Sequence, residues 1–189
     1  MLYDLVRKNR SYRRFDESVS LDKETLLELV DLARLSATGS NMQPLRYLVY
    51  ADRESNARIF DCLAWAGFIK EWPGPDEGER PSGYIVILGD TEVKKGFGCD
   101  HGIAAQSMLL GAVEKGLGGC MLGAINRKKL AETLAIDERY EVLLVIAVGK
   151  PVEEVVLDAV GEDGSTRYWR DEGQVHHVPK WGLDQIVLN

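Results

Sequence analysis

Two short polar segments near the N-terminus carry the residue types that bind a phosphorylated ligand with a polar ring. Residues 9–15 read Asn-Arg-Ser-Tyr-Arg-Arg-Phe and place three arginines and a serine within five positions. Guanidinium groups bind phosphate oxygens through paired hydrogen bonds, and the hydroxyl adds a further donor. Residues 37–44 read Ala-Thr-Gly-Ser-Asn-Met-Gln-Pro and offer backbone amides and an Asn side chain to a ring edge. Taken singly, the first segment is more typical of a solvated helix end and the second of an ordinary loop.

A glycine-rich passage at residues 116–124 is the third candidate for a ligand contact. It is not a Walker phosphate loop, because no Gly-Lys-Ser/Thr follows the glycines. It does not fit the dinucleotide fingerprint either, because its glycines follow a predicted helix, whereas that fingerprint follows a strand. We expect these glycines to let the backbone approach a flat ligand closely, the alternative being simple turn glycines.

Four ordered matches between residues 9 and 180 resemble the nitroreductase family of FMN-dependent oxidoreductases. The first two are the polar segments above, which are similar to the family patterns Arg-Arg-Ser-x-Arg-x-Phe and Pro-Ser-x-x-Asn-x-Gln-Pro. The third spans a helix from Asp100 and the Gly-Leu-Gly-Gly-Cys turn at 116–120, and the fourth is Val-Pro-Lys at 178–180. The resemblance implies an α+β nitroreductase-like fold, with a central mixed, mostly antiparallel sheet flanked by helices, in an intertwined homodimer.

The resemblance also implies a set of FMN contacts. Arg10 and Ser11 would bind the phosphate, joined by Lys180, and Arg13 would lie at the pyrimidine edge of the flavin. Thr38, Gly39 and Asn41 would contact the flavin from the other subunit. The backbone of Gly123 and Ala124 would lie near flavin N5. Lys180 has the alternative of being a plain surface lysine.

Three positions depart from the family pattern. Asn9 stands where an arginine is usual, Leu45 stands where many members have tryptophan, and Gly182 falls where some members have another arginine. These departures bear on the set of phosphate ligands.

The expected activity is transfer of electrons from NADH or NADPH to a small acceptor by a ping-pong mechanism. Nitroaromatics, quinones, free flavins and enones are all candidate acceptors, and Trp65, Phe68 and Trp72 are candidates for stacking on an aromatic one. We expect no catalytic side chain, because the cofactor would carry out the chemistry. The protein would position the cofactor and supply the electrostatic environment. The alternatives are a specialised relative (a dehalogenase, an azoline oxidase or a flavin-fragmenting enzyme), a flavin-delivery protein without physiological turnover, and a structural dimeric module without cofactor.

No other constellation in the sequence predicts catalysis or metal binding. Cys99 and His101 lack a third ligand at a suitable spacing, so we expect no metal site. His176 and His177 are adjacent, and neighbours on an extended strand point to opposite faces. We therefore interpret them as a polar strand pair.

The elements that would position these residues alternate between helices and strands. Helices are predicted at 2–8, from a cap at Ser20 or Asp22 to Ser36, at 53–66, at 100–115 and at 127–134 after Asn126. Strands are predicted at 45–50, 84–88 and 143–148, and the loop at 72–79 contains two prolines, two glycines and three acids. Residues 1–151 would form the FMN-binding core of a single domain. Residues 152–189 would be an arm that packs on the core or on a partner subunit.

Composition sets the remaining limits. The chain has 189 residues, a net charge of −7 and 45% hydrophobic residues, which is ordinary for one globular domain. The acidic balance argues against nucleic acid and membrane surfaces as partners. No apolar run approaches the roughly 18–20 residues that span a bilayer, and the first residues do not resemble a signal peptide, so we expect a cytoplasmic protein.

Overall fold

A computed structural model describes residues 1–69 and 71–189. Its central sheet has the strand order β1-β2-β4-β3, and every neighbouring pair is antiparallel. The strands are β1 (Leu45–Tyr50), β2 (Gly83–Asp90), β3 (Gly118–Leu122) and β4 (Tyr140–Gly149). The sheet confirms the three predicted strands and adds β3, which begins inside the glycine-rich passage.

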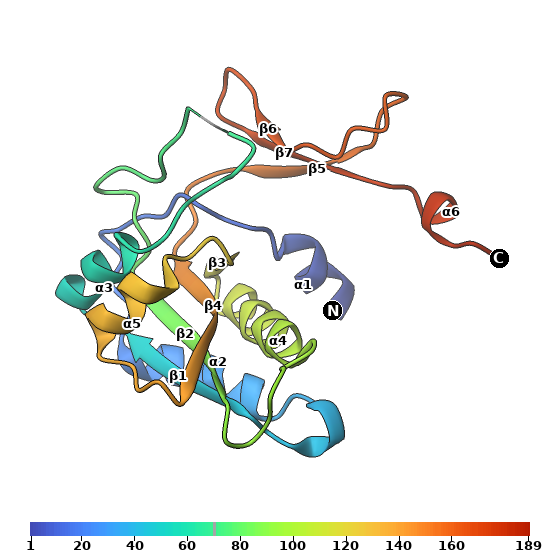
Figure 1. The fold of residues 1–189 in the computed structure, drawn as a ribbon. Helices are drawn as coiled ribbons and strands as arrows, with labels where there is room; N and C mark the ends of the chain where they lie inside the picture. Colours follow the sequence, from blue (N-terminus) through green and yellow to red (C-terminus); the bar gives the residue numbers. More distant parts are fainter. Residues whose placement is uncertain (70) are drawn as a thin grey trace.

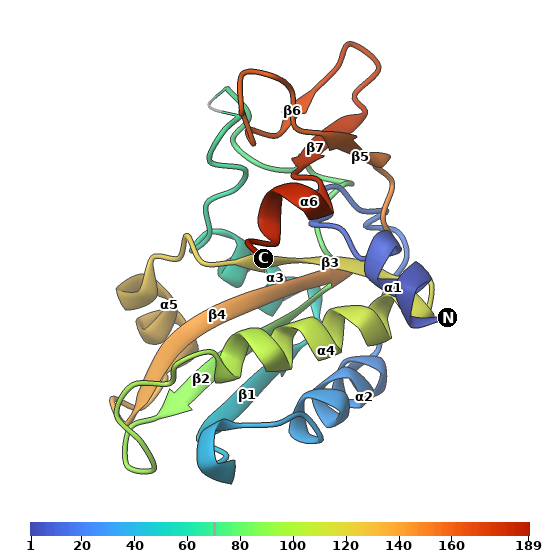
Figure 2. The ribbon, with the colours of Figure 1, turned by 90° about the vertical axis from the view of Figure 1, so that its right-hand side faces the viewer.

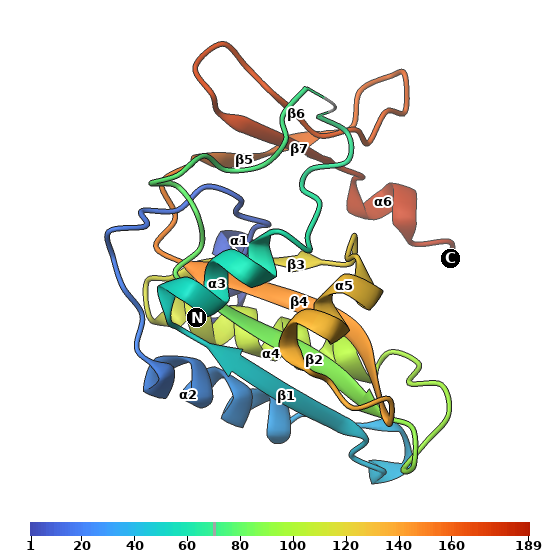
Figure 3. The same cartoon turned by 60° about the vertical axis from the view of Figure 1, so that its left-hand side comes forward.

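Helices cover both faces of this sheet. Figure 2 shows α2 (Lys23–Arg34) and α4 (Asp100–Glu114) on one face, and Figure 3 shows α3 (Arg53–Phe60) and α5 (Arg127–Leu134) on the other. The side chains of β2 alternate between the two layers. Ile85 and Ile87 pack under α2 and α4, while Val86 and Leu88 pack under α3 and α5. A strand buried on both faces explains the unbroken apolar run in its sequence.

The predicted helix boundaries hold at most ends. Asp22 caps α2 through Thr25 N (2.7 Å) and Asn126 caps α5 through Lys129 N (3.1 Å), and α1 (Leu2–Lys8) has its predicted bounds. The small residues of α4 permit the expected close helix contact, since a Cβ on Gly111 would lie 2.2 Å from a Leu32 side-chain carbon.

The helix predicted at 53–66 is wrong in its second half, because α3 ends at Phe60. The following residues pair with the segment after β3 instead. Leu63 forms a bridge with Ile125, and Ala64 N donates to Ala124 O at 2.9 Å. Those backbone groups are therefore engaged across the chain and are not available for helical hydrogen bonds.

The chain after residue 151 builds a small second sheet. β5 (Val155–Ala159) pairs in parallel with β7 (His176–Lys180), and β6 (Trp169–Arg170) pairs antiparallel with β7. Figure 1 shows this sheet apart from the central one, with α6 (Leu183–Ile186) projecting outward. In the described part of the chain, none of the helices has the length and apolar character needed to cross a membrane.

Candidate functional site

The arginine-rich segment is fixed on the edge of the central sheet. Ser11 forms a parallel bridge with Gly119, and Tyr12 N donates to Gly119 O at 3.0 Å. Phe15 is fully buried and forms a bridge with Pro151. The backbone between these anchors holds the side chains of residues 10–14 near β3.

The three arginines of this segment have different surroundings. Arg14 is engaged, because its Nε and Nη2 donate to Glu79 at 2.6 and 2.5 Å. That pairing raises the pKa of Arg14 and lowers the pKa of Glu79. Arg10 donates only to Val6 O at 2.8 Å, its Nε is buried without a partner, and it has no ion pair within residues 1–69 and 71–189. Burial lowers the pKa of Arg10. Arg10 is therefore available to an anion, and Arg14 is not.

The third arginine, Arg13, is held by the C-terminal arm. Its guanidinium lies 4.9 Å from the centre of the Tyr168 ring, with Nη1 3.4 Å from His176 Nε2. The arm is fixed in turn by Glu153, whose Oε1 accepts hydrogen bonds from the backbone N–H groups of Arg13 and Arg14. Its Oε2 binds Arg170 Nη2 at 3.0 Å, and both of these side chains are buried. The arm and the arginine segment thus form one connected network.

The segment with Thr38, Gly39 and Asn41 lies elsewhere on the same chain. Gly39 N donates to Asp100 Oδ1 at 2.9 Å, at the start of α4. Ser40 and Asn41 have left-handed φ values of 52° and 53°, which shapes a tight exposed loop. Figure 2 shows this loop, between α2 and β1, apart from α1 and the arginine segment. One chain does not bring the two halves of the predicted site together.

The glycine-rich passage divides into packed and open glycines. A Cβ on Gly119 would lie 2.4 Å from Ala147 O, and one on Gly118 would lie 2.5 Å from the Tyr12 ring. These two glycines serve packing within the chain, so the expected ligand approach is wrong for them. Gly123 is exposed with nothing within 4 Å of an added Cβ, and Ala124 beside it is exposed. A ligand can approach the passage there.

The remaining candidates differ in access. Lys180 ends β7, and its exposed side chain makes no hydrogen bond or ion pair with any described residue. Phe68 is 52% exposed and lies 5.1 Å from the Tyr168 ring. Trp65 is buried against Phe60, so it does not present a free face for stacking, and the Arg170 guanidinium covers one face of Trp72. The described residues contain no cluster of three metal-ligating side chains.

Sequence reasoning missed several buried polar groups that organise these surroundings. Glu153, which joins the arm to the arginine segment, stands in the sequence only as one residue of the predicted arm. Asp90 is fully buried, and its carboxylate binds Arg139 Nε and Nη2 at 2.8 and 2.6 Å, which lowers the pKa of Asp90. Asp100 is also buried and holds Gly39. An acidic residue in the sequence does not reveal a partner residue that lies far along the chain.

Comparison with known proteins places this architecture in a family. The nitroreductase family profile matches residues 6–82 and 96–150, which together exceed half of the chain. YodC of Bacillus subtilis, named as an NAD(P)H nitroreductase, is 24% identical over 180 residues, covering 79% of this chain and 89% of YodC.

Two solved structures show the same likeness. An FMN-dependent nitroreductase from Clostridium difficile is 26% identical with a TM-score of 0.66, covering 79% of this chain and 87% of its own. A nitroreductase family protein from Streptococcus pneumoniae aligns over 100% of both chains with a TM-score of 0.73, at 16% identity. The second match concerns the fold alone. The chain belongs to the nitroreductase family.

Proposed function

We propose that this protein is an FMN-dependent oxidoreductase that uses NADH or NADPH to reduce a small acceptor. One observation carries the proposal: Arg10 presents a guanidinium without an ion pair among the described residues, beside the exposed Ser11, on a fixed segment of a nitroreductase-family chain. A dianionic phosphate matches this pair of donors. The FMN-dependent relative from Clostridium difficile and the NAD(P)H nitroreductase name of YodC support the same cofactor and donor.

The residues of this chain fit FMN on structural grounds. Arg10 Nε is a buried donor without a partner, which is costly unless a ligand accepts its hydrogen bond. Arg13 would place positive charge at the pyrimidine edge of the ring, and Lys180 is exposed for the phosphate. The open backbone at Gly123 and Ala124 would lie beside the ring. Bound FMN would supply the hydride acceptor and donor that no side chain provides.

The complete site would require two copies of the chain. Thr38, Gly39 and Asn41 lie apart from Arg10 within one chain, and a homodimer would bring them to the partner's flavin. The arm exposes apolar side chains that a partner would cover, with Leu183 at 74% and Leu188 at 96% exposed. We propose the division into a core at residues 1–151 and an arm at 152–189 on the same basis.

The proposed cycle is ping-pong, so NAD(P)H delivers its hydride and leaves before the acceptor enters. Candidate acceptors are nitroaromatics, quinones and flavins. The exposed ring of Phe68, with Arg167 5.4 Å from its centre, would offer one face to an aromatic acceptor.

Steady-state kinetics of the FMN-loaded protein tests this cycle. NADH and NADPH are each varied against fixed concentrations of a nitroaromatic and of a quinone. Parallel lines in double-reciprocal plots are expected. Intersecting lines would contradict the ping-pong order, and absence of NAD(P)H oxidation with every acceptor would favour a flavin-delivery protein.

A further inference from the structure

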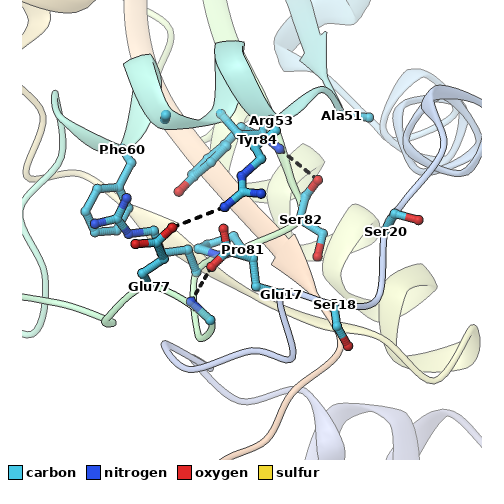
Figure 4. Close-up of a pocket in the computed structure, with 14 residues that line it drawn as sticks. Glu17, Ser18, Ser20, Ala51, Arg53, Phe60, Glu77, Pro81, Ser82 and Tyr84 are labelled. Carbon is cyan, nitrogen blue, oxygen red and sulfur yellow. Dashed lines mark hydrogen bonds and ion pairs between the residues drawn. The ribbon is translucent and has the colours of Figure 1, made fainter.

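A cavity of about 700 Å³ lies outside the proposed flavin site, beside the start of α3. Its walls come from the loop after Phe15, from the first turns of α3 and from the segment that leads into β2. None of the residues proposed to bind FMN lines it. Figure 4 shows the side chains that do, among them Glu17, Arg53, Phe60, Glu77 and Tyr84.

Three of the residues that line this cavity each carry a buried polar atom without a hydrogen-bond partner among the described residues: Asn56 Oδ1, Arg80 Nε and the Tyr84 hydroxyl. Tyr84 is only 1% exposed. Asn56 Nδ2 donates to Ser82 O at 2.9 Å, which fixes the amide and leaves its oxygen as an acceptor. Unpaired buried polar atoms are costly, so three at one cavity indicate a polar ligand.

The charges on the cavity separate into one satisfied pair and two single groups. Arg53 and Glu77 pair at 3.1 Å and so neutralise each other. Arg80 and Glu17 each have no ion pair within the described residues. The Arg80 guanidinium lies 4.3 Å from the centre of the Phe60 ring, and Glu17 Oε2 accepts one hydrogen bond from Gly78 N at 2.6 Å. One unpaired cation and one unpaired anion therefore face the same space.

We propose that this cavity binds an α-amino acid as its zwitterion. The ligand carboxylate binds Arg80 and the Tyr84 hydroxyl, and its ammonium group donates to Asn56 Oδ1 and Glu17. The apolar parts of Ala57, Phe60 and Pro81 accept the side chain. This arrangement gives every unpaired group a partner of matching charge or hydrogen-bonding type.

Calorimetric titration of the full-length protein with three matched compounds tests the ligand class. L-leucine carries both charges, 4-methylpentanoate lacks the ammonium group and 3-methylbutylamine lacks the carboxylate. We expect leucine to bind, and each analogue to bind roughly tenfold more weakly, since each loses a charge-assisted interaction. Absence of binding by all three at millimolar concentration, or equal binding by all three, would overturn the proposal.

Variants assign the two ends of the ligand. Arg80→Gln and Tyr84→Phe are expected to weaken leucine binding roughly tenfold or more, while Glu17→Gln removes the preference for leucine over 4-methylpentanoate. Tyr50→Phe is the control, because Tyr50 pairs with Tyr84 across the sheet and does not line the cavity.

Tyr84→Phe also has a stability readout. It removes a buried hydroxyl that has no partner, so the melting temperature should not fall. Leucine binding that persists unchanged in the three cavity variants would place the ligand elsewhere and contradict the assignment. FMN binding, measured separately, should be unchanged in all of them, which keeps this site distinct from the flavin proposal.

Discussion

Arg10, Arg13 and Arg14 show how far neighbouring residues of one type can differ in what they are free to do. Glu79 occupies the fork of Arg14, and Tyr168 and His176 surround Arg13. Among the residues that the structure describes, Arg10 has only the Val6 carbonyl as a hydrogen-bond partner. By residue type alone the three are equivalent, whereas their partners in the structure leave Arg10 as the arginine that we propose binds the phosphate.

Replacement of Arg10 tests this selection. Arg10→Gln should weaken FMN binding by on the order of tenfold to a hundredfold, because one charge-assisted contact to the phosphate is lost. Its folding stability should change little. Arg34→Gln, which removes an exposed arginine paired with Asp31 on α2, is the matched control. Fluorescence titration with FMN provides the measurement, and equal affinities in the two variants would disprove the role of Arg10.

Arg14→Gln should lower folding stability and leave FMN affinity nearly unchanged. Its loss leaves Glu79 without the donor that lowers the pKa of that carboxyl, so the cost falls on stability. We expect a lower denaturant midpoint and an FMN affinity close to that of the unaltered protein. A selective loss of FMN affinity without loss of stability would show that Arg14 contacts the cofactor.

His176 should make the free energy of unfolding depend on pH. Burial, with Arg13 and Arg170 nearby, lowers the pKa of His176 from 6.5 to about 4. Between these values the unfolded chain binds a proton that the folded chain does not, so the free energy of unfolding falls as the pH drops from 6.5 toward 4. His176→Gln should flatten this slope in denaturant titrations.

The adjacent His177 provides a control of opposite sign. Asp158 and Asp171 raise the pKa of His177, so its contribution to stability is present at low pH and is lost as the pH rises through that pKa. His177→Gln should therefore steepen the acid loss. A slope that is the same in both variants would show that neither histidine governs it.

At the scale of the elements, one buried carboxylate joins the arm to the core. Glu153 accepts hydrogen bonds from the backbone of the arginine segment and pairs with Arg170 on β6. The side chains of this pair are 0% and 8% exposed. An ion pair this deep is costly to break from one side, because the remaining charge stays buried.

Glu153→Gln should lower the free energy of unfolding by about 3 kcal/mol. It should also make residues 152–189 more susceptible to limited proteolysis. The exposed neighbour Glu154, changed to Gln, is the control, since His176 N donates to the backbone oxygen of Glu154 and not to its side chain. Equal proteolysis and equal stability in the two variants would show that Glu153 does not hold the arm on the core.

An element can be predicted from the sequence when neighbouring residues define it, and cannot when its bounds depend on contacts far along the chain. α1, α2, α5 and β1 could be predicted because local caps and apolar spacing define them, as Asp22 and Asn126 show. The length of α3 could not, because the pairing of Leu63 with Ile125 depends on a segment far along the chain. The ordered motifs predicted the family, whereas the packing role of Gly118 and Gly119 required the contacts with Tyr12 and Ala147.

At the scale of the whole molecule, the proposed site is complete only when two chains associate. The described chain keeps the arginine segment apart from Thr38, Gly39 and Asn41. It also leaves the apolar side chains of α6 exposed, and a protein–protein contact would cover such a patch. Assembly and cofactor binding should therefore be linked, so that losing one weakens the other.

Leu183→Asp tests this linkage. A carboxylate on the exposed face of α6 should oppose burial against a partner, so the protein should shift from dimer to monomer and bind FMN more weakly. Val152→Asp is the control, because Val152 is also about half exposed, at 51%, but lies outside α6. Light scattering after size-exclusion chromatography gives the mass, and an unaltered protein that runs as a monomer with full FMN affinity would rule out the shared site.

The most direct test of the central claim is the visible absorption spectrum of the FMN-reconstituted protein, recorded anaerobically before and after addition of NADH and then of NADPH. We expect flavin bands that bleach with at least one donor and return when an acceptor is added. A protein that retains no flavin after reconstitution, or whose bands persist with both donors, would contradict an FMN-dependent NAD(P)H oxidoreductase.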